Sequence, residues 1–181
     1  MDDITHHRPA FLNGWRIAGW GAAAALLALP AIAMRFSGEV AWSPGDFLFA
    51  AVLLIALGLG IEIAMRLRTG IAGRAGMIVT SIAAFLTVWA NGAVGIIGNE
   101  GEPVNQGFYA LVLAALLAGA AARFRPRVMQ WVCGLVAAGQ LLLGFTALAL
   151  MPGHGVEWGV LAFFAALWGG AALMFRKAAG R

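Results

Sequence analysis

Long runs of apolar residues constrain the fold of this 181-residue chain more than any other feature. A helix needs about 20 residues to cross the roughly 30 Å of hydrocarbon in a bilayer. Hydrophobic residues make up 62% of the sequence and charged residues 11%, which is more apolar surface than the core of a soluble domain holds. The pattern predicts an all-α, polytopic membrane protein with a single transmembrane domain over residues 1–181.

Six transmembrane helices are expected, joined by short loops, with the fourth helix the shortest. Short loops predict that sequential helices are antiparallel neighbours in one bundle. An alternative concerns the first span, because Ala31-Ile32-Ala33 has the small-residue form of a signal-peptidase site, and cleavage there would leave five helices. The predicted spans are about 15–34, 47–65, 75–98, 107–122, 128–150 and 156–175.

Basic residues fall almost entirely on one side of the predicted membrane. Eleven of the twelve Lys and Arg residues lie in the tails and loops of that side, and Arg35 alone lies on the other. The positive-inside rule therefore predicts that both termini are cytoplasmic. The acidic residues Glu39, Asp46, Glu100 and Glu102 would then face outward. Basic residues that flank spans also argue against a nucleic-acid partner, despite the pI near 10.6.

The signatures of several enzyme and cofactor classes are missing from the sequence. It contains no GxSxG elbow, P-loop or HExxH motif. None of its three histidines falls in a predicted span, which excludes a bis-histidine haem site on one chain. We therefore expect no enzymatic activity and no cofactor. A membrane enzyme that acts on a lipid or quinone, with Glu39 or Asp46 as base, stays an alternative, although no nucleophile–base pair is visible.

The stretch Trp89–Asn105, WANGAVGIIGNEGEPVN, begins in the third predicted span and ends in an acidic loop. If the span stays helical to residue 98, Asn91, Gly95 and Gly98 share one face. The glycines would leave room beside the amide for a neighbouring helix or a ligand. An Asn in hydrocarbon must find a partner. Asn91 therefore either bonds to a neighbouring backbone or lines an outward-facing cavity.

These polar residues predict an outward-facing site for a cation or small polar solute. Hard cations take several carboxylate and amide oxygens, although the sequence names no particular metal. The protein would then be a small binding or transport unit. The alternative is a non-catalytic accessory or assembly subunit of a larger membrane complex, and a homo-oligomer also fits. The predicted site residues are Arg35, Glu39, Trp42, Asp46, Trp89, Asn91, Glu100 and Glu102.

Some of the same polar and small residues also have structural interpretations. Asp46 follows a Pro-Gly turn, which is typical of a helix N-cap. Gln140, in the middle of the fifth span, is expected to be an interhelical hydrogen-bond partner rather than a substrate contact. Gly134 and Ala138, four residues apart, predict close packing inside the bundle.

The pattern W-x-N-G-A-V-G-I-I-G at Trp89 to Gly98, with MRFSGEVAW before the second span, resembles a family of small, uncharacterised bacterial inner-membrane proteins. The resemblance covers the first four predicted spans. It implies a multi-pass protein of a bacterial inner membrane and no particular activity.

Overall fold

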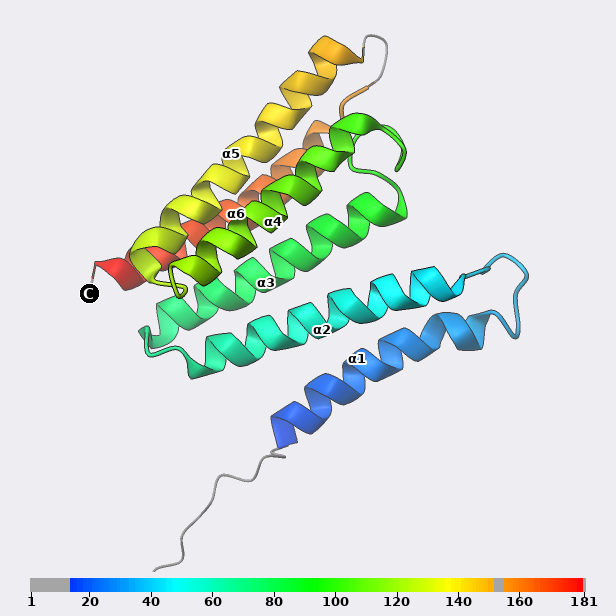
Figure 1. Ribbon diagram of the computed structural model, residues 1–181, viewed down its shortest axis with the longest axis horizontal. Helices are drawn as coiled ribbons and strands as arrows, with labels where there is room; N and C mark the ends of the chain where they lie inside the picture. Colours follow the sequence, from blue (N-terminus) through cyan, green and yellow to red (C-terminus); the bar gives the residue numbers. More distant parts are fainter. Residues whose placement is uncertain (1–13, 152–154, 181) are drawn as a thin grey trace, which may run out of the picture. The chain divides into compact units, whose positions relative to one another are not determined.

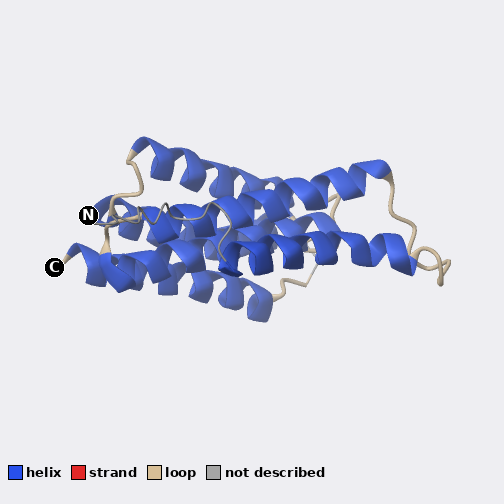
Figure 2. Ribbon diagram, turned by 90° about the horizontal axis from the view of Figure 1, so that it is seen from below, coloured by secondary structure: helices blue, strands red, loops and turns tan. Residues whose placement is uncertain are grey.

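The computed structural model describes residues 14–151 and 155–180, and all regular secondary structure in these ranges is helical (Figure 2). Six helices in this part of the chain are long and apolar enough to cross a membrane, which confirms the prediction of an all-α, multi-pass protein. Arg8 and Arg181, used in the charge argument, lie outside the described residues. The elements are α1 Gly14–Ala33, α2 Pro44–Arg66, α3 Gly70–Ala93, the 3₁₀ helix η1 Pro103–Asn105, α4 Gln106–Ala121, α5 Pro126–Leu150 and α6 Trp158–Ala179 (Figure 1).

Contacts divide the chain into two units, residues 1–58 and 59–181. The first unit contains α1 and most of α2. All of α1 is described, and it holds no buried residue. The Trp20 ring nevertheless lies against Gly58 of α2, where an added Cβ would come within 2.7 Å of the ring. The first unit is therefore a helical pair with little core of its own.

In the second unit, α3 to α6 form a closed up-and-down bundle. Each helix packs on the next in sequence, and α6 returns to pack on α3 (Figure 1). The predicted antiparallel arrangement of sequential helices is thus confirmed for these four. Glycines on α5 permit the close approach. An added Cβ would lie 2.8 Å from Leu111 at Gly139 and 2.5 Å from Leu161 at Gly144.

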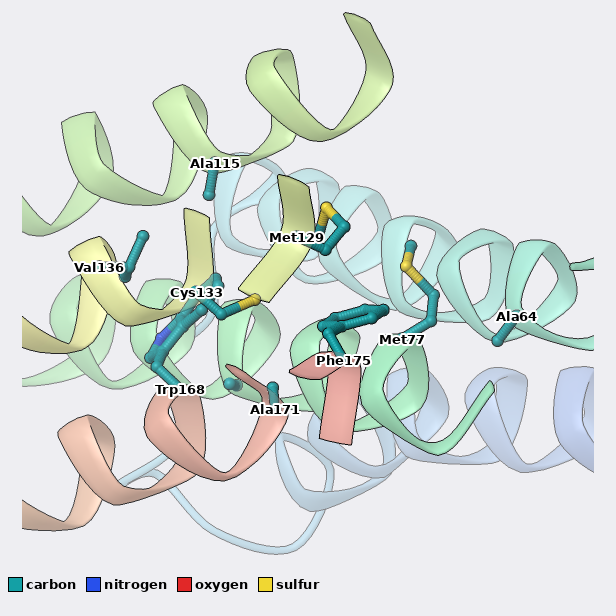
Figure 3. Close-up of a cluster of buried hydrophobic side chains, with 10 residues drawn as sticks. Ala64, Met77, Ala115, Met129, Cys133, Val136, Trp168, Ala171 and Phe175 are labelled. Atoms are coloured by element: carbon teal, nitrogen blue, oxygen red, sulfur yellow. The ribbon is translucent and has the colours of Figure 1, made fainter. Parts of the chain in front are cut away.

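Two apolar clusters fill the bundle of the second unit. The arginine-side cluster lies toward the end where α4 turns into α5, and the loop-side cluster lies toward the connection between α3 and α4. The arginine-side cluster contains Ala64, Met77, Ala83, Ala115, Met129, Cys133, Val136, Trp168, Ala171 and Phe175 (Figure 3). The loop-side cluster contains Ile96, Ile97, Phe108, Ala147, Leu161 and Phe164.

The start of α2 is a reciprocal capping box. The Asp46 carboxylate accepts hydrogen bonds from the Ser43 backbone N–H at 2.7 Å and the Ser43 hydroxyl at 2.9 Å. The Asp46 N–H donates to Ser43 Oγ at 3.3 Å, and Pro44 occupies the first helical position. The prediction that Asp46 is the N-cap is therefore wrong, because Ser43 precedes the helix and Asp46 is its third residue.

Substituting Asp46 with alanine should loosen the first turn of α2. The change removes both hydrogen bonds to the carboxylate, and losing a cap costs about 1 kcal/mol, or roughly a fivefold change in an equilibrium constant. Hydrogen exchange at the amides of residues 46 and 47 should accelerate by about that factor. Glu39→Ala, at an exposed acidic position, is the control and should leave these exchange rates unchanged. Equal exchange rates in wild type and Asp46→Ala would show that the capping box adds no stability.

The third helix ends earlier than the sequence predicts. α3 stops at Ala93, whereas the predicted span runs to residue 98. Gly95 and Gly98 have φ values of 78° and 67°, in the left-handed region that ends helices. Asn91, Gly95 and Gly98 therefore do not share a helical face, and this prediction is wrong. The predicted start of this span, residue 75, lies five residues after the observed Gly70, and the bounds of the other spans lie within four residues of those observed.

Candidate functional site

The connection between α3 and α4, residues 94–105, folds into the end of the bundle. Ile96 and Ile97 are only 3% and 0% exposed and belong to the loop-side cluster, together with Phe108 of α4 and Leu161 of α6. Backbone groups of such a buried loop need hydrogen-bond partners other than water. The local sequence must therefore supply polar side chains inside the fold.

Asn105 supplies these partners. Its side chain is fully buried, and its Nδ2 donates to the carbonyl oxygens of Ile97 at 3.0 Å and Asn99 at 2.7 Å. Its Oδ1 accepts the Ile97 N–H at 3.1 Å. The sequence interpretation placed Asn105 in an exposed acidic loop and missed this role. The available signal was the apolar Ile96-Ile97 pair between two glycines, which indicates a loop with a buried centre.

Asn91 joins the end of α3 to this loop. Its side chain is 1% exposed, and its Nδ2 donates to the carbonyl oxygen of Asn105 at 2.9 Å. Bonding to a neighbouring backbone, one of its two predicted roles, is therefore observed. A carbonyl can only accept, so this bond fixes the orientation of the amide. Asn91 Oδ1 is buried and has no hydrogen-bond partner among the described residues.

The predicted site residues of the first unit lie near the start of α2. Arg35 and Glu39 are exposed. Trp42 is half-buried and meets Phe47 edge to face, with 5.2 Å between ring centroids. Asp46 belongs to the capping box. The hydrogen bonds of the capping box explain the position of Asp46, so no ligand is needed to explain it.

The remaining predicted residues belong to the second unit. Trp89 is half-buried and stacks on Phe85, with 5.9 Å between ring centroids. Glu100 is exposed, and Glu102 accepts a hydrogen bond from Asn99 Nδ2 at 3.3 Å. Across residues 14–151 and 155–180, no group of three or more His, Cys, Asp or Glu side chains is placed to hold a metal ion. The structure thus pairs Asn91 with Asn105 and Glu102 with Asn99.

The register between α3 and α5 places a further polar residue inside the bundle. These two helices run in the same direction (Figure 1), and Thr80 Oγ1 lies 3.4 Å from Cys133 Sγ. Seven residues farther along each helix, about 10 Å, stand Thr87 and Gln140. Both side chains are 0% exposed. Thr87 and Gln140 therefore lie at about the same level of the bundle interior.

Gln140 is buried without the interhelical bond that its sequence position predicts. Neither Oε1 nor Nε2 has a hydrogen-bond partner in the described part of the chain, so that prediction is wrong. Thr87, by contrast, accepts the Trp168 indole N–H at 3.3 Å and donates to the Ala83 carbonyl at 2.7 Å. An unpaired buried polar group costs about 1–3 kcal/mol, which makes Gln140 an exception that needs a reason.

Thr87, Asn91 and Gln140 form what we call the polar layer. Its residues lie between members of the two apolar clusters along α3 and α5. On α5, Val136 of the arginine-side cluster precedes Gln140, and Ala147 of the loop-side cluster follows it. Trp168, whose indole nitrogen is visible in Figure 3, bounds the layer on the arginine side. Among the described residues, the bundle therefore holds buried amide side chains with unpaired atoms between two apolar clusters.

Replacing Trp168 with phenylalanine should lower the thermal midpoint of the detergent-solubilised protein by a few degrees. The change removes the indole bond to Thr87, worth about 1 kcal/mol, from a fully buried position. Trp131 on α5 is 70% exposed, so Trp131→Phe serves as the matched control and should leave the midpoint unchanged. Equal midpoints for both variants would show that the Thr87 bond adds nothing to stability.

No family model, curated protein or solved structure matches this chain. The resemblance carried by Trp89 to Gly98 therefore stays a prediction.

Proposed function

We propose that the protein is a small binding or transport unit of the bacterial inner membrane, with Asn91 at its ligand site. The supporting observation is the Asn91 carboxamide, which is buried below the 94–105 loop and leaves Oδ1 without a described partner. Polar groups inside a membrane bundle are costly, and those that occur there often serve function. Contact with a small polar solute would offset the cost.

In this proposal both termini are cytoplasmic and the 94–105 loop faces outward, as the distribution of basic residues predicts. A membrane-impermeant maleimide should label Glu100→Cys in intact cells. It should label Arg125→Cys only after the membrane is permeabilised. The native Cys133 is buried and serves as an unreactive background. The reverse labelling pattern would contradict the proposed orientation.

Ligand binding can be tested by thermal unfolding of the purified protein in detergent. The panel contains Na⁺, K⁺, Mg²⁺ and small neutral and charged organic solutes. A ligand at 100 times its Kd stabilises by about 2.7 kcal/mol, a shift of several degrees. Asn91→Ala should abolish the shift, whereas Glu100→Gln should retain it unless a cation is the ligand. A panel in which no compound raises the midpoint would refute the proposal.

A second function, a non-catalytic accessory or assembly subunit, is favoured by the outer face of α5. An added Cβ at Gly134 would meet no atom within 4 Å in the described structure, and Ala138 is exposed. The prediction that these two residues pack inside the bundle is therefore wrong. In lipid, such a small-residue face suits contact with another helix. Purification in mild detergent with a stoichiometric partner would favour this role, and a lone or self-associated chain would favour binding or transport.

A further inference from the structure

We infer that the polar layer binds a small neutral solute that carries both hydrogen-bond donors and an acceptor, as primary amides and ureas do. This inference rests on the proposed binding function and specifies its ligand chemistry. It also moves the centre of the site from the acidic loop to Thr87, Asn91 and Gln140, inside the bundle.

The unpaired atoms of the polar layer define what the ligand must offer. Asn91 Oδ1 and Gln140 Oε1 accept hydrogen bonds, and Gln140 Nε2 donates them. The Thr87 hydroxyl already donates a hydrogen bond to the Ala83 carbonyl and accepts one from the Trp168 indole. Thr87 would therefore contact the ligand mainly by packing rather than by a new hydrogen bond. A complementary solute therefore presents two N–H groups and one carbonyl oxygen. Both features occur together in a carboxamide or urea group.

The surroundings of the polar layer select against a charged ligand. Among the described residues, the buried polar side chains are all uncharged: Thr80, Ser81, Thr87, Asn91, Asn105 and Gln140. A bare ion at this depth would have no countercharge, and burying an unpaired charge costs far more than burying a neutral polar group. Of the acids in the 94–105 loop, Glu100 is exposed, and the half-buried Glu102 accepts a hydrogen bond from Asn99 Nδ2.

The axial spacing of the polar layer indicates the length of ligand that would span it. Asn91 stands four residues beyond Thr87 on α3, about 6 Å along the axis. Trp168 bounds the layer on one side, and Ile97 of the loop-side cluster lies toward the other. Because Gln140 lies at about the level of Thr87, a solute about one helical turn long would span the axial distance between Gln140 and Asn91. Both apolar clusters would exclude water from it.

The test follows the side-chain amide signals of the protein in detergent micelles, labelled with ¹⁵N-glutamine. The chain has three glutamines. Gln106 is exposed and Gln130 donates to the Arg127 carbonyl, so both are internal controls. The probes are acetamide, acetone and acetate, which share one shape. Acetamide should shift the Gln140 signal saturably, acetone should do so at least tenfold more weakly for lack of donors, and acetate should have no effect.

A Gln140→Met variant separates a ligand contact from a structural residue. Methionine keeps the approximate length of the side chain and removes the unpaired polar atoms. The variant should therefore unfold at a temperature at least as high as wild type. With ¹⁵N-asparagine labelling, it should lose the acetamide response of the Asn91 signal. A variant that is less stable than wild type yet keeps this response would overturn the inference.

The remaining outcomes distinguish this inference from the proposed function. If acetate or a cation shifts the Gln140 signal and acetamide does not, the ligand chemistry is wrong while binding stands. If a solute raises the thermal midpoint without affecting Gln140, the binding site lies elsewhere. If no solute has either effect and Gln140 shows contact with water only, both the inference and the proposed binding function fail.

Discussion

Replacing Asn105 with alanine should destabilise the bundle of α3 to α6 by about 3 kcal/mol, at roughly 1 kcal/mol for each lost hydrogen bond. The side chain makes three bonds to the 94–105 loop, two to Ile97 and one to Asn99. Because Ile97 is fully buried, its N–H and carbonyl would be left without water or another described partner. The thermal midpoint in detergent should fall by on the order of 10 °C.

Asn99 offers the control for this experiment in the same loop. It is exposed, and its side chain bonds only to Gly101 and Glu102 among the described residues. Asn99→Ala should change the stability by less than about 1 kcal/mol. If Asn105→Ala unfolds at the same temperature as Asn99→Ala, the loop is not held by Asn105 and the structural account of this segment is wrong.

Replacing Gly95 with alanine should destabilise the protein by more than about 2 kcal/mol. Gly95 has φ of 78°, where an L-residue carries strain. An added Cβ would also lie 2.4 Å from the backbone carbon of Asn99. A backbone atom cannot rotate away as a side chain can, so the loop must shift. Thermal unfolding in detergent provides the measurement.

Gly134→Ala is the matched control for Gly95→Ala and should have the opposite sign. Gly134 lies inside α5, where an added Cβ meets no described atom within 4 Å. Alanine is favoured over glycine in a helix by up to about 1 kcal/mol. The Gly134→Ala variant should therefore unfold at a slightly higher temperature than wild type. A Gly95→Ala variant as stable as Gly134→Ala would contradict the tight turn after α3.

Apolar length and flanking residues predict most of the fold. The six spans are each visible in the sequence, because crossing hydrocarbon demands long, uninterrupted apolar runs. The end of α3 was misplaced because Val94, Ile96 and Ile97 continue the apolar run after the helix has stopped. Hydropathy does not separate a helix from a loop that is buried in protein. Only the left-handed glycines at 95 and 98 mark the difference.

The site was harder to predict than the fold. The acidic residues are visible in the sequence, whereas the burial of an amide side chain depends on tertiary contacts. Asp46 is explained by its hydrogen bonds to Ser43, three residues away. Asn91 was identified from its depth in the third span. Asn105 was given another role because its bonds depend on the fold of the 94–105 loop. Gln140 was given another role because its surroundings depend on how helices far apart in sequence pack. The periodicity of the sequence does not predict which buried amide side chains form hydrogen bonds.

The claim that the polar layer, rather than the acidic loop, holds the ligand can be tested by locating a bound probe. In perdeuterated protein with protonated side-chain amides, the methyl protons of acetamide should give intermolecular nuclear Overhauser effects. We expect contacts to the side-chain amides of Asn91 and Gln140, and none to the exposed Asn99. Contacts to Asn99 alone, or to no side-chain amide at saturating acetamide, would contradict the claim.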